Sequence, residues 1–468
     1  MLLKNISKKI QKREAIEEKK ARATSIKEGV AYSVSEGFGT NYITPYALSI
    51  GANNAQIGIL KSLPQLVGTF AQLYTIKEMW KYNRKKIVFI GVLIQAILWL
   101  AIISVGTLYF VFGLYSKITP TLLIIVYTLL IAFGTATIPA WSSWMKDLVP
   151  EKLMGKYFGN RNKILGSVVL LSLLGAGFVL DYFKQTYLFL GFVILFGLAF
   201  IGRLISVYYL KKQYEPEFEV EREYYFTFRQ FVKKLPYTNF GKFVIFYGTM
   251  LFATSIAVPF FAVYMLTDLE FSYLLFTIIL IVGTASRLLF MPLWGKLSDK
   301  YGNVTTIKNT AKMIPFVPLL WFLSPLIIKL NPSLILPYLI IVEGFSGFCW
   351  AGFDLSASNF IYATVSRQKM ALCVTYHSII TNVGVFVGTI IGGIIATLSI
   401  SFWWITPLLF VFLLSFVLRA VSCIFFLSKI KEERTDVKQF KMELEAKKEL
   451  KMFSPKHLLQ HMHLRFKL

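Results

Sequence analysis

The sequence predicts an all-α integral membrane protein in which twelve transmembrane helices form two pseudo-symmetric bundles of six. Three observations lead to this fold class. The chain of 468 residues is 56% hydrophobic, which exceeds what a soluble domain of this length needs. Its apolar residues gather in runs of about 20, the length that a helix needs to cross a bilayer. Features of the first half of the chain recur in the second half.

The chain begins with a basic segment. Residues 1–28 carry nine Lys and Arg residues among acidic ones, and no short apolar core with a cleavage site follows them, as a signal peptide would require. We therefore expect residues 1–28 to form a basic cytoplasmic arm that lies at the membrane interface.

Twelve apolar runs follow this arm, and each is long enough to span a bilayer as a helix. They cover residues 29–50, 55–74, 87–113, 121–145, 163–183, 187–210, 241–266, 271–293, 305–328, 334–358, 371–398 and 402–428. The runs define an N-terminal bundle at 29–210 and a C-terminal bundle at 241–428. Residues 429–468 are then a basic cytoplasmic tail.

The basic residues indicate which ends of the spans face the cytoplasm. With the N-terminus inside, 43 of the 50 Lys and Arg residues lie on the termini and the connections on that side, 3 on the opposite connections and 4 within spans. This is the positive-inside asymmetry. We expect both termini in the cytoplasm and the chain in the plasma membrane. The net charge of +25 then reflects topology and anionic lipid headgroups, and it predicts no nucleic-acid partner.

Two halves of the sequence resemble each other at an offset of 216 residues. VPEKLMG at 149–155 corresponds to VSRQKMA at 365–371, and Arg203 corresponds to Arg419. Between the halves, the linker at 211–240 is first acidic and then basic and aromatic in FTFRQFVKKL, a pattern typical of a short helix on the membrane surface. Parallel six-span repeats predict a central site that opens to alternate sides of the membrane.

The connection between the eighth and ninth spans interrupts the apolar chain with GKLSDKYGN at 295–303. Its pattern Gly-x-x-x-Asp-Lys-x-Gly resembles the signature loop of the major facilitator superfamily, and the connection after the fourth span resembles that family's Pro-Glu-x-x-x-Gly pattern. The residues that carry the two patterns are Gly295, Asp299, Lys300, Gly302, Pro150, Glu151 and Gly155. The resemblance covers essentially the whole chain and implies a transporter in which these loops latch the cytoplasmic ends of helices in one conformation and release them in the other.

The glycines of the signature loop permit a tight turn and a close approach of helices. Asp299 is expected near the start of a helix, where the positive end of the helix dipole stabilises a carboxylate. The sequence departs from the family pattern in two places. Asn303 and Val304 stand where basic residues usually follow, and the equivalent first-half loop, KEMWKYNRKK, lacks the glycines and has Asn83 at the aspartate position. A weaker first-half latch is the expectation.

Charged residues inside spans are costly and therefore need a role. Glu36 and Glu343 lie within apolar runs and are candidate sites for proton coupling or cation binding. The alternative for Glu36 is a structural pairing with Arg287. Arg287 itself is a candidate for binding an anionic substrate group, or for neutralising Glu36 or Glu343. Asp354 is expected to pair with loop cations.

The remaining polar residues in spans have weaker functional signals. His377 is a candidate for a proton path, and Asn41 and Asn382 are candidates for substrate hydrogen bonds or for bonds between helices. Arg203 and Arg419 are expected to be structural and to reach the headgroups by snorkelling, as is Lys61 at the opposite end of its span.

These features predict a secondary active transporter that moves a small solute by alternating access, with protons or Na⁺ as candidate coupling ions. No phosphate-binding loop G-x-x-x-x-G-K-[ST] is present, so the sequence predicts no ATPase of that kind. We expect no cofactor, no metal site and no enzymatic activity, with membrane lipids as neighbours and a monomer as the default state. A transporter-like sensor or assembly factor and a membrane-embedded lipid-modifying enzyme are the alternatives. The residues suit a sugar, a drug, a peptide or an organic anion alike.

Overall fold

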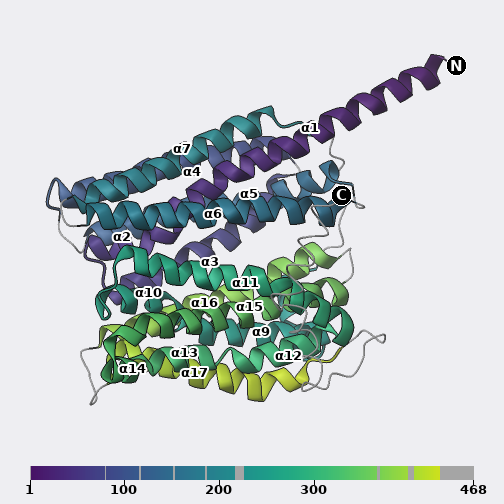
Figure 1. Ribbon diagram of the computed structural model, residues 1–468. Coiled ribbons are helices and arrows are strands. Elements are labelled where there is room, and N and C mark those ends of the chain that lie inside the picture. The colour runs from purple at the N-terminus through teal and green to yellow at the C-terminus, as the bar shows by residue number, and fades with distance from the viewer. Residues whose placement is uncertain are drawn as a thin grey trace, which may run out of the picture.

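A computed structural model describes residues 2–79, 81–114, 118–150, 153–184, 187–216, 226–365, 369–398 and 405–432. The described residues form helices and short connections. Figure 1 shows them as two bundles lying side by side, with α1 to α7 in one and α9 to α17 in the other. The predicted fold class is therefore confirmed.

The first bundle comprises α1 (Leu2–Phe38), η1 (Thr40–Tyr42), α2 (Ile43–Ser49), α3 (Asn54–Glu78), α4 (Arg84–Phe110), α5 (Ile118–Leu148), α6 (Met154–Phe183) and α7 (Leu188–Lys212). The predicted boundary between residues 28 and 29 falls within α1, which projects beyond the bundle in Figure 1. The predicted first span is broken at Gly39, where a Cβ atom would come within 2.4 Å of Trp99.

The second bundle follows the short helix α8 (Phe228–Lys234), which confirms the helix predicted in the linker. It comprises α9 (Asn239–Ser255), α10 (Val258–Thr267), α11 (Tyr273–Tyr301), α12 (Asn303–Met313), α13 (Phe316–Phe322), α14 (Ser324–Leu330), η3 (Pro332–Leu334), α15 (Ile335–Thr364), α16 (Met370–Thr397), α17 (Pro407–Phe426) and η5 (Leu427–Lys429). The predicted seventh and ninth spans are thus divided. Proline lies in the first turn of α10 and of α14, where its missing N–H costs no helical hydrogen bond.

Nine helices in the described part of the chain are long and apolar enough to cross a membrane, and the bent pair Asn303–Phe322 and Ser324–Leu330 makes a tenth. The two other predicted spans coincide with α1 to α2 and with α3. The arrangement agrees with twelve spans.

The two bundles meet mainly where α3 packs on α16 and α6 on α11, and α10 also contacts α2 and α3. Small residues let the backbones approach, as is common between membrane helices. A Cβ atom on Gly58 of α3 would lie 2.6 Å from the carbonyl oxygen of Thr389 on α16. One buried apolar cluster contains residues of both bundles, among them Tyr42 and Phe260.

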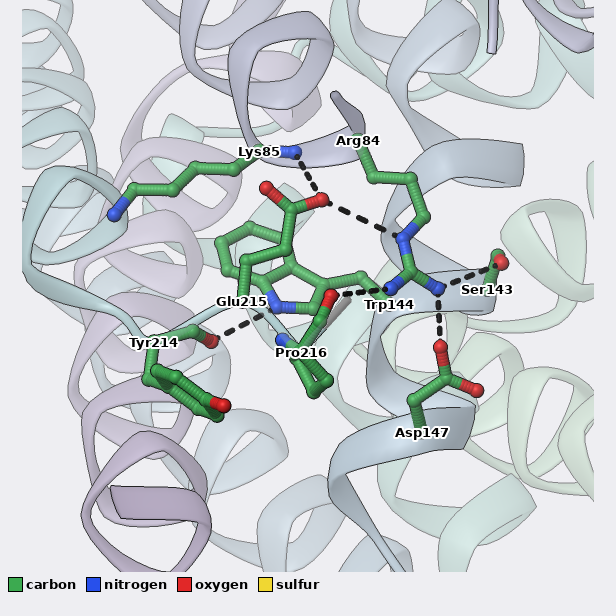
Figure 2. A network of polar contacts seen from close by, with 8 residues as sticks. All are labelled: Arg84, Lys85, Ser143, Trp144, Asp147, Tyr214, Glu215 and Pro216. Atoms are coloured by element: carbon green, nitrogen blue, oxygen red, sulfur yellow. Dashed lines mark hydrogen bonds and ion pairs between the residues drawn. The ribbon is translucent and has the colours of Figure 1, made fainter. Parts of the chain in front are cut away.

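The start of the linker is fixed to the first bundle by Arg84, whose side chain is fully buried (Figure 2). Its guanidinium donates to Asp147 at 2.5 Å and to Ser143 at 3.1 Å, both on α5. It also pairs with Glu215 at 3.5 Å and donates to the carbonyl oxygen of Pro216 at 3.3 Å. A buried arginine is tolerated where carboxylates and carbonyl groups satisfy it.

One capping contact of this network has a counterpart in the second bundle. Glu215, just beyond α7, accepts a hydrogen bond from the backbone N–H of Lys85 at the start of α4, at 3.2 Å. Glu432, just beyond η5, accepts one from the N–H of Val304 at the start of α12, at 2.8 Å. In each bundle a carboxylate thus follows the last span and caps the N-terminus of the third span, where the helix dipole favours negative charge.

Candidate functional site

A first cavity, of about 440 Å³, lies inside the first bundle. Glu36 of α1 lines it, together with Gln95 and Trp99 of α4 and Arg203 of α7. Within the described part of the chain, the Glu36 carboxylate makes no hydrogen bond or ion pair. A carboxylate that faces a cavity in this way is available to a proton, a cation or a solute.

Arg203 and Arg419 are buried, so the prediction that they snorkel to the headgroups is wrong. Arg203 donates to Gln95 and lies over the ring of Tyr32, 4.5 Å from its centroid. Arg419 donates to Ser415 at 3.0 Å and to backbone carbonyl groups of neighbouring helices. Interior carbonyl, amide and aromatic groups satisfy both guanidinium groups, so they need no contact with lipid headgroups.

A second cavity, of about 430 Å³, lies between the bundles. Lys61, Glu343, Trp350 and Arg419 line it. Glu343 accepts a hydrogen bond from the indole N–H of Trp321 at 3.1 Å. The prediction that Lys61 snorkels is wrong, because its side chain faces this cavity. Lys61 has no hydrogen bond or ion pair with any residue that the structure describes.

Arg287 and Asp354 form an ion pair between α11 and α15. Asp354 therefore does not pair with loop cations, and that prediction is wrong. The proposed pairings of Arg287 with Glu36 or Glu343 are also wrong, because the guanidinium is engaged by Asp354. The Arg287 side chain is 47% exposed, so the pair lies at an accessible surface of the second bundle.

The other three candidate residues make contacts between elements. Asn41 lines the second cavity and donates to the backbone oxygen of Glu36 at 3.1 Å. Asn382 of α16 donates to the Thr69 hydroxyl of α3 at 2.5 Å, which joins the two bundles. His377 is buried and packs against the ring of Tyr247, at a centroid distance of 5.1 Å. The structure thus brings Asn41 to the second cavity, while Asn382 and His377 occupy packing positions.

The signature loop forms a sharp connection between α11 and α12. Gly302 has a φ of 92°, which favours glycine. The prediction that Asp299 lies near the start of a helix is wrong, because Asp299 and Lys300 lie in the last turn of α11. A Cβ atom on Gly295 would meet Leu355 at an ordinary distance of 3.5 Å.

The other loop with a family pattern is only partly described. Pro150 follows α5, and Gly155 lies in the first turn of α6. Glu151 lies outside the described residues. The latch role of these loops therefore stays a prediction.

Polar contacts join the two bundles where α6 ends and α11 begins. Asp181 of α6 accepts hydrogen bonds from the backbone N–H groups of Tyr273 and Leu274, at 2.7 Å and 3.0 Å, and so caps α11. Tyr42 bonds the hydroxyl of Thr277 at 2.5 Å. We call this set of contacts the closed end.

A further contact at the closed end joins α3 to α16. Asn54 donates to the carbonyl oxygen of Ala396 at 2.8 Å. The N-termini of α3 and α11 therefore meet the C-termini of α16 and α6 at this end.

Sequence reasoning did not identify Asp181 as a candidate residue, and it assigned Lys61 to the membrane interface instead of to a cavity. The signal for Lys61 was present, because a lysine within an apolar run is costly unless it faces a polar interior. Asp181 ends an apolar run, where a charge is unremarkable, so its role depends on the partner helix. Among the described residues, no group of three His, Cys, Asp or Glu side chains is placed to hold a metal ion.

Comparisons with known proteins place this geometry in context. A family model described as Major Facilitator Superfamily matches residues 29–311 and 243–461. A comparison with curated protein sequences finds no match.

Solved structures of similar fold were also found. A point mutant of the nucleoside transporter NupG is 15% identical, with a TM-score of 0.68, over 88% of this chain and 100% of that one. A bacterial homologue of the iron transporter ferroportin, in an inward-facing state, is 11% identical, with a TM-score of 0.69, over 88% of this chain and 99% of that one. In an outward-facing state the ferroportin homologue is 11% identical, with a TM-score of 0.57, over 87% and 99%. At these identities the likeness is one of fold.

Proposed function

We propose, from the premise that this chain belongs to the Major Facilitator Superfamily, that it is a secondary transporter that carries a small organic solute by alternating access. A membrane transporter is what the family and the fold support. The observation that carries the finer proposal is that Glu36 and Lys61 each face a cavity without a hydrogen bond or ion pair to any described residue, although Arg203 lines the same cavity as Glu36.

The cost of burying charge supports a ligand at these positions. An unpaired charge in a span is expensive, and such residues usually face a water-filled cavity or a substrate pathway. The second cavity offers the Lys61 ammonium beside an amide, an indole and a partly satisfied carboxylate. A solute with an anionic group and a polar or aromatic body would fit this lining, with the anion at Lys61.

The coupling ion is proposed to be a proton that binds at Glu36. This carboxylate can gain or lose a proton without breaking a hydrogen bond or ion pair with a described residue. Glu343 is a second candidate, although protonation there would alter its hydrogen bond from Trp321. Na⁺ is the alternative ion, since both sites offer carboxylate oxygen.

The conformation is proposed to be inward-facing. The closed end joins the N-termini of α3 and α11 to the C-termini of α16 and α6. The distribution of basic residues predicts that this end faces outward, with both termini in the cytoplasm and the chain in the plasma membrane. The higher TM-score to the inward-facing than to the outward-facing ferroportin homologue supports the same conformation.

The first test is a ligand search followed by a flux measurement. Thermal stabilisation of the purified protein against a library of metabolites would be measured at two pH values. A ligand at about 100 times its Kd stabilises by roughly 2.7 kcal/mol in the reversible limit. Each hit would then be measured for uptake into proteoliposomes, with and without a pH gradient.

Two variants assign the roles of the charges. Lys61→Gln is expected to weaken binding of an anionic hit, whereas Glu36→Gln is expected to abolish the effect of the pH gradient and to leave solute exchange intact. Asp268→Asn is the matched control for Glu36→Gln, because Asp268 is an exposed carboxylate beyond α10. Pure binding without flux would indicate a sensor and refute transport. A gradient effect that survives Glu36→Gln would refute coupling at this residue.

A further inference from the structure

Two hollows outside the central cavities meet at one lysine. The first, the apolar groove, has a volume of about 620 Å³ and lies between α3, α4 and α5. The second, the basic pocket, has a volume of about 290 Å³ and lies between the start of α4 and the end of α7. Lys86 lines both of them, so the two hollows adjoin at this side chain.

The basic pocket has an excess of positive charge. Lys85, Lys86 and Lys211 line it, with Glu215 as its carboxylate. Glu215 is already engaged by the Arg84 guanidinium and by the Lys85 backbone N–H (Figure 2). Lys86 and Lys211 are exposed, so their ammonium groups are available to an anion.

The apolar groove has the lining of a lipid-facing surface. Ile90, Leu129 and Phe133 are 43%, 43% and 37% exposed, and they lie on α4 and α5, which are long and apolar enough to cross a membrane. At its polar end, the Lys86 ammonium lies over the Tyr82 ring, 5.2 Å from the centroid, and the lining carboxylate Glu78 is paired with Lys81 at 3.8 Å. Tyrosine and lysine together are typical of the headgroup level of a membrane. The hollows therefore pair an anion-binding end with an acyl-binding end.

We propose that the apolar groove and the basic pocket together bind one anionic phospholipid of the cytoplasmic leaflet. Its phosphate lies at Lys86 and Lys211, and an acyl chain occupies the groove. Basic pockets between spans on the cytoplasmic side are suited to anionic headgroups. The occupant sits beside the Arg84 network, so it would brace the connection between α3 and α4 and the start of the linker.

The test uses the full-length chain after purification and delipidation. It is titrated with phosphatidylglycerol or with phosphatidylcholine of the same acyl chains, and lipid binding is measured by native mass spectrometry. One phosphatidylglycerol is expected to bind more tightly than any phosphatidylcholine. In the variant Lys86→Gln with Lys211→Gln its affinity is expected to fall roughly tenfold or more, because each lysine near an anionic headgroup contributes about a fivefold factor. The control, Lys233→Gln with Lys234→Gln, removes the same charge from α8 and is expected to bind as the parent does.

Further arms separate the possible occupants. Ala71→Leu fills the groove and is expected to weaken phosphatidylglycerol binding, while sn-glycerol 3-phosphate and inorganic phosphate are expected to bind far more weakly than the lipid. Equal binding of the two lipids, equal loss in the control, or full affinity in Ala71→Leu would each overturn the proposal. The proposal would also be overturned if lipid bound only after the linker residues Glu217 and Glu219 were changed to Gln. That result would mean that the linker, and not a lipid, occupies the basic pocket in the parent protein. Unchanged thermal unfolding without lipid in the Lys86 and Lys211 variant shows that folding is not the cause.

Discussion

Neutralising Asp181 is expected to open the closed end. The carboxylate accepts two backbone hydrogen bonds, at 2.7 Å and 3.0 Å, from the first turn of α11. It is the partner of a helix N-terminus that belongs to the other bundle, so its charge favours the state in which the bundles touch at this end. The variant Asp181→Asn keeps one acceptor oxygen and removes the charge.

The magnitude follows from these contacts. Hydrogen bonds to charged groups contribute roughly 1.5–3 kcal/mol each, against about 0.5–1.5 kcal/mol for neutral ones, and the helix dipole adds about 0.3–1 kcal/mol. Because Asp181 is only partly buried, we take the lower end of the difference, about 1.5 kcal/mol. The ratio of open to closed molecules at this end should therefore rise roughly tenfold.

The assay is a spin-label distance measurement across the closed end. Labels at Tyr187 and Leu330, which are 66% and 79% exposed and belong to different bundles, would be introduced after replacing the native cysteines. The long-distance population is expected to grow in Asp181→Asn. Asp268→Asn is the control, because among the described residues this carboxylate at the same end accepts a hydrogen bond from the neighbouring Thr267 alone. An unchanged distance distribution in Asp181→Asn, or an equal shift in the control, would refute the reasoning.

Two further predictions follow from packing and from the Arg84 network. Gly58→Ala should also favour opening of the closed end, because its Cβ would lie 2.6 Å from the Thr389 carbonyl oxygen and overpacking costs about 1–3 kcal/mol. The control is Gly159→Ala, whose Cβ meets no atom within 4 Å and which should leave the spin-label distances unchanged. Equal behaviour of the two variants would contradict the packing argument. Arg84→Ala should lower the free energy of unfolding by about 2–3 kcal/mol. This is below the range for fully buried ion pairs, because one partner carboxylate, Asp147, is 39% exposed. A thermal midpoint equal to that of the parent would show that the network contributes no stability.

Several parts of the candidate site were within reach of sequence reasoning. Glu36, Asn41 and Glu343 were predicted as polar residues inside spans, and all three line the cavities. The reasoning succeeds for them because a charge or amide in an apolar run must face a polar interior. Their roles in transport stay predictions.

Pairings between distant segments were not within reach. Arg287 was considered as a partner of an anionic substrate group or of Glu36 or Glu343, and it pairs instead with Asp354. Asp181 and Tyr273 are separated by 92 positions, and no pattern in either segment points to the other. Span runs that are apolar on every side give no periodicity that tells which face of one helix meets which neighbour.

The sequence by itself determined the membrane class, the order of the spans, the two-fold repetition and the family resemblance. Bilayer thickness and the cost of buried charge constrain the length and the composition of each span, so they can be read locally. Only the tertiary structure decided which polar groups meet. It broke the first span at Gly39, where Trp99 leaves no room for a side chain. It directed the side chain of Lys61 towards the second cavity, and it placed Asp181 against the N-terminus of α11. These outcomes depend on the packing of helices from different parts of the chain, which no single run of residues records.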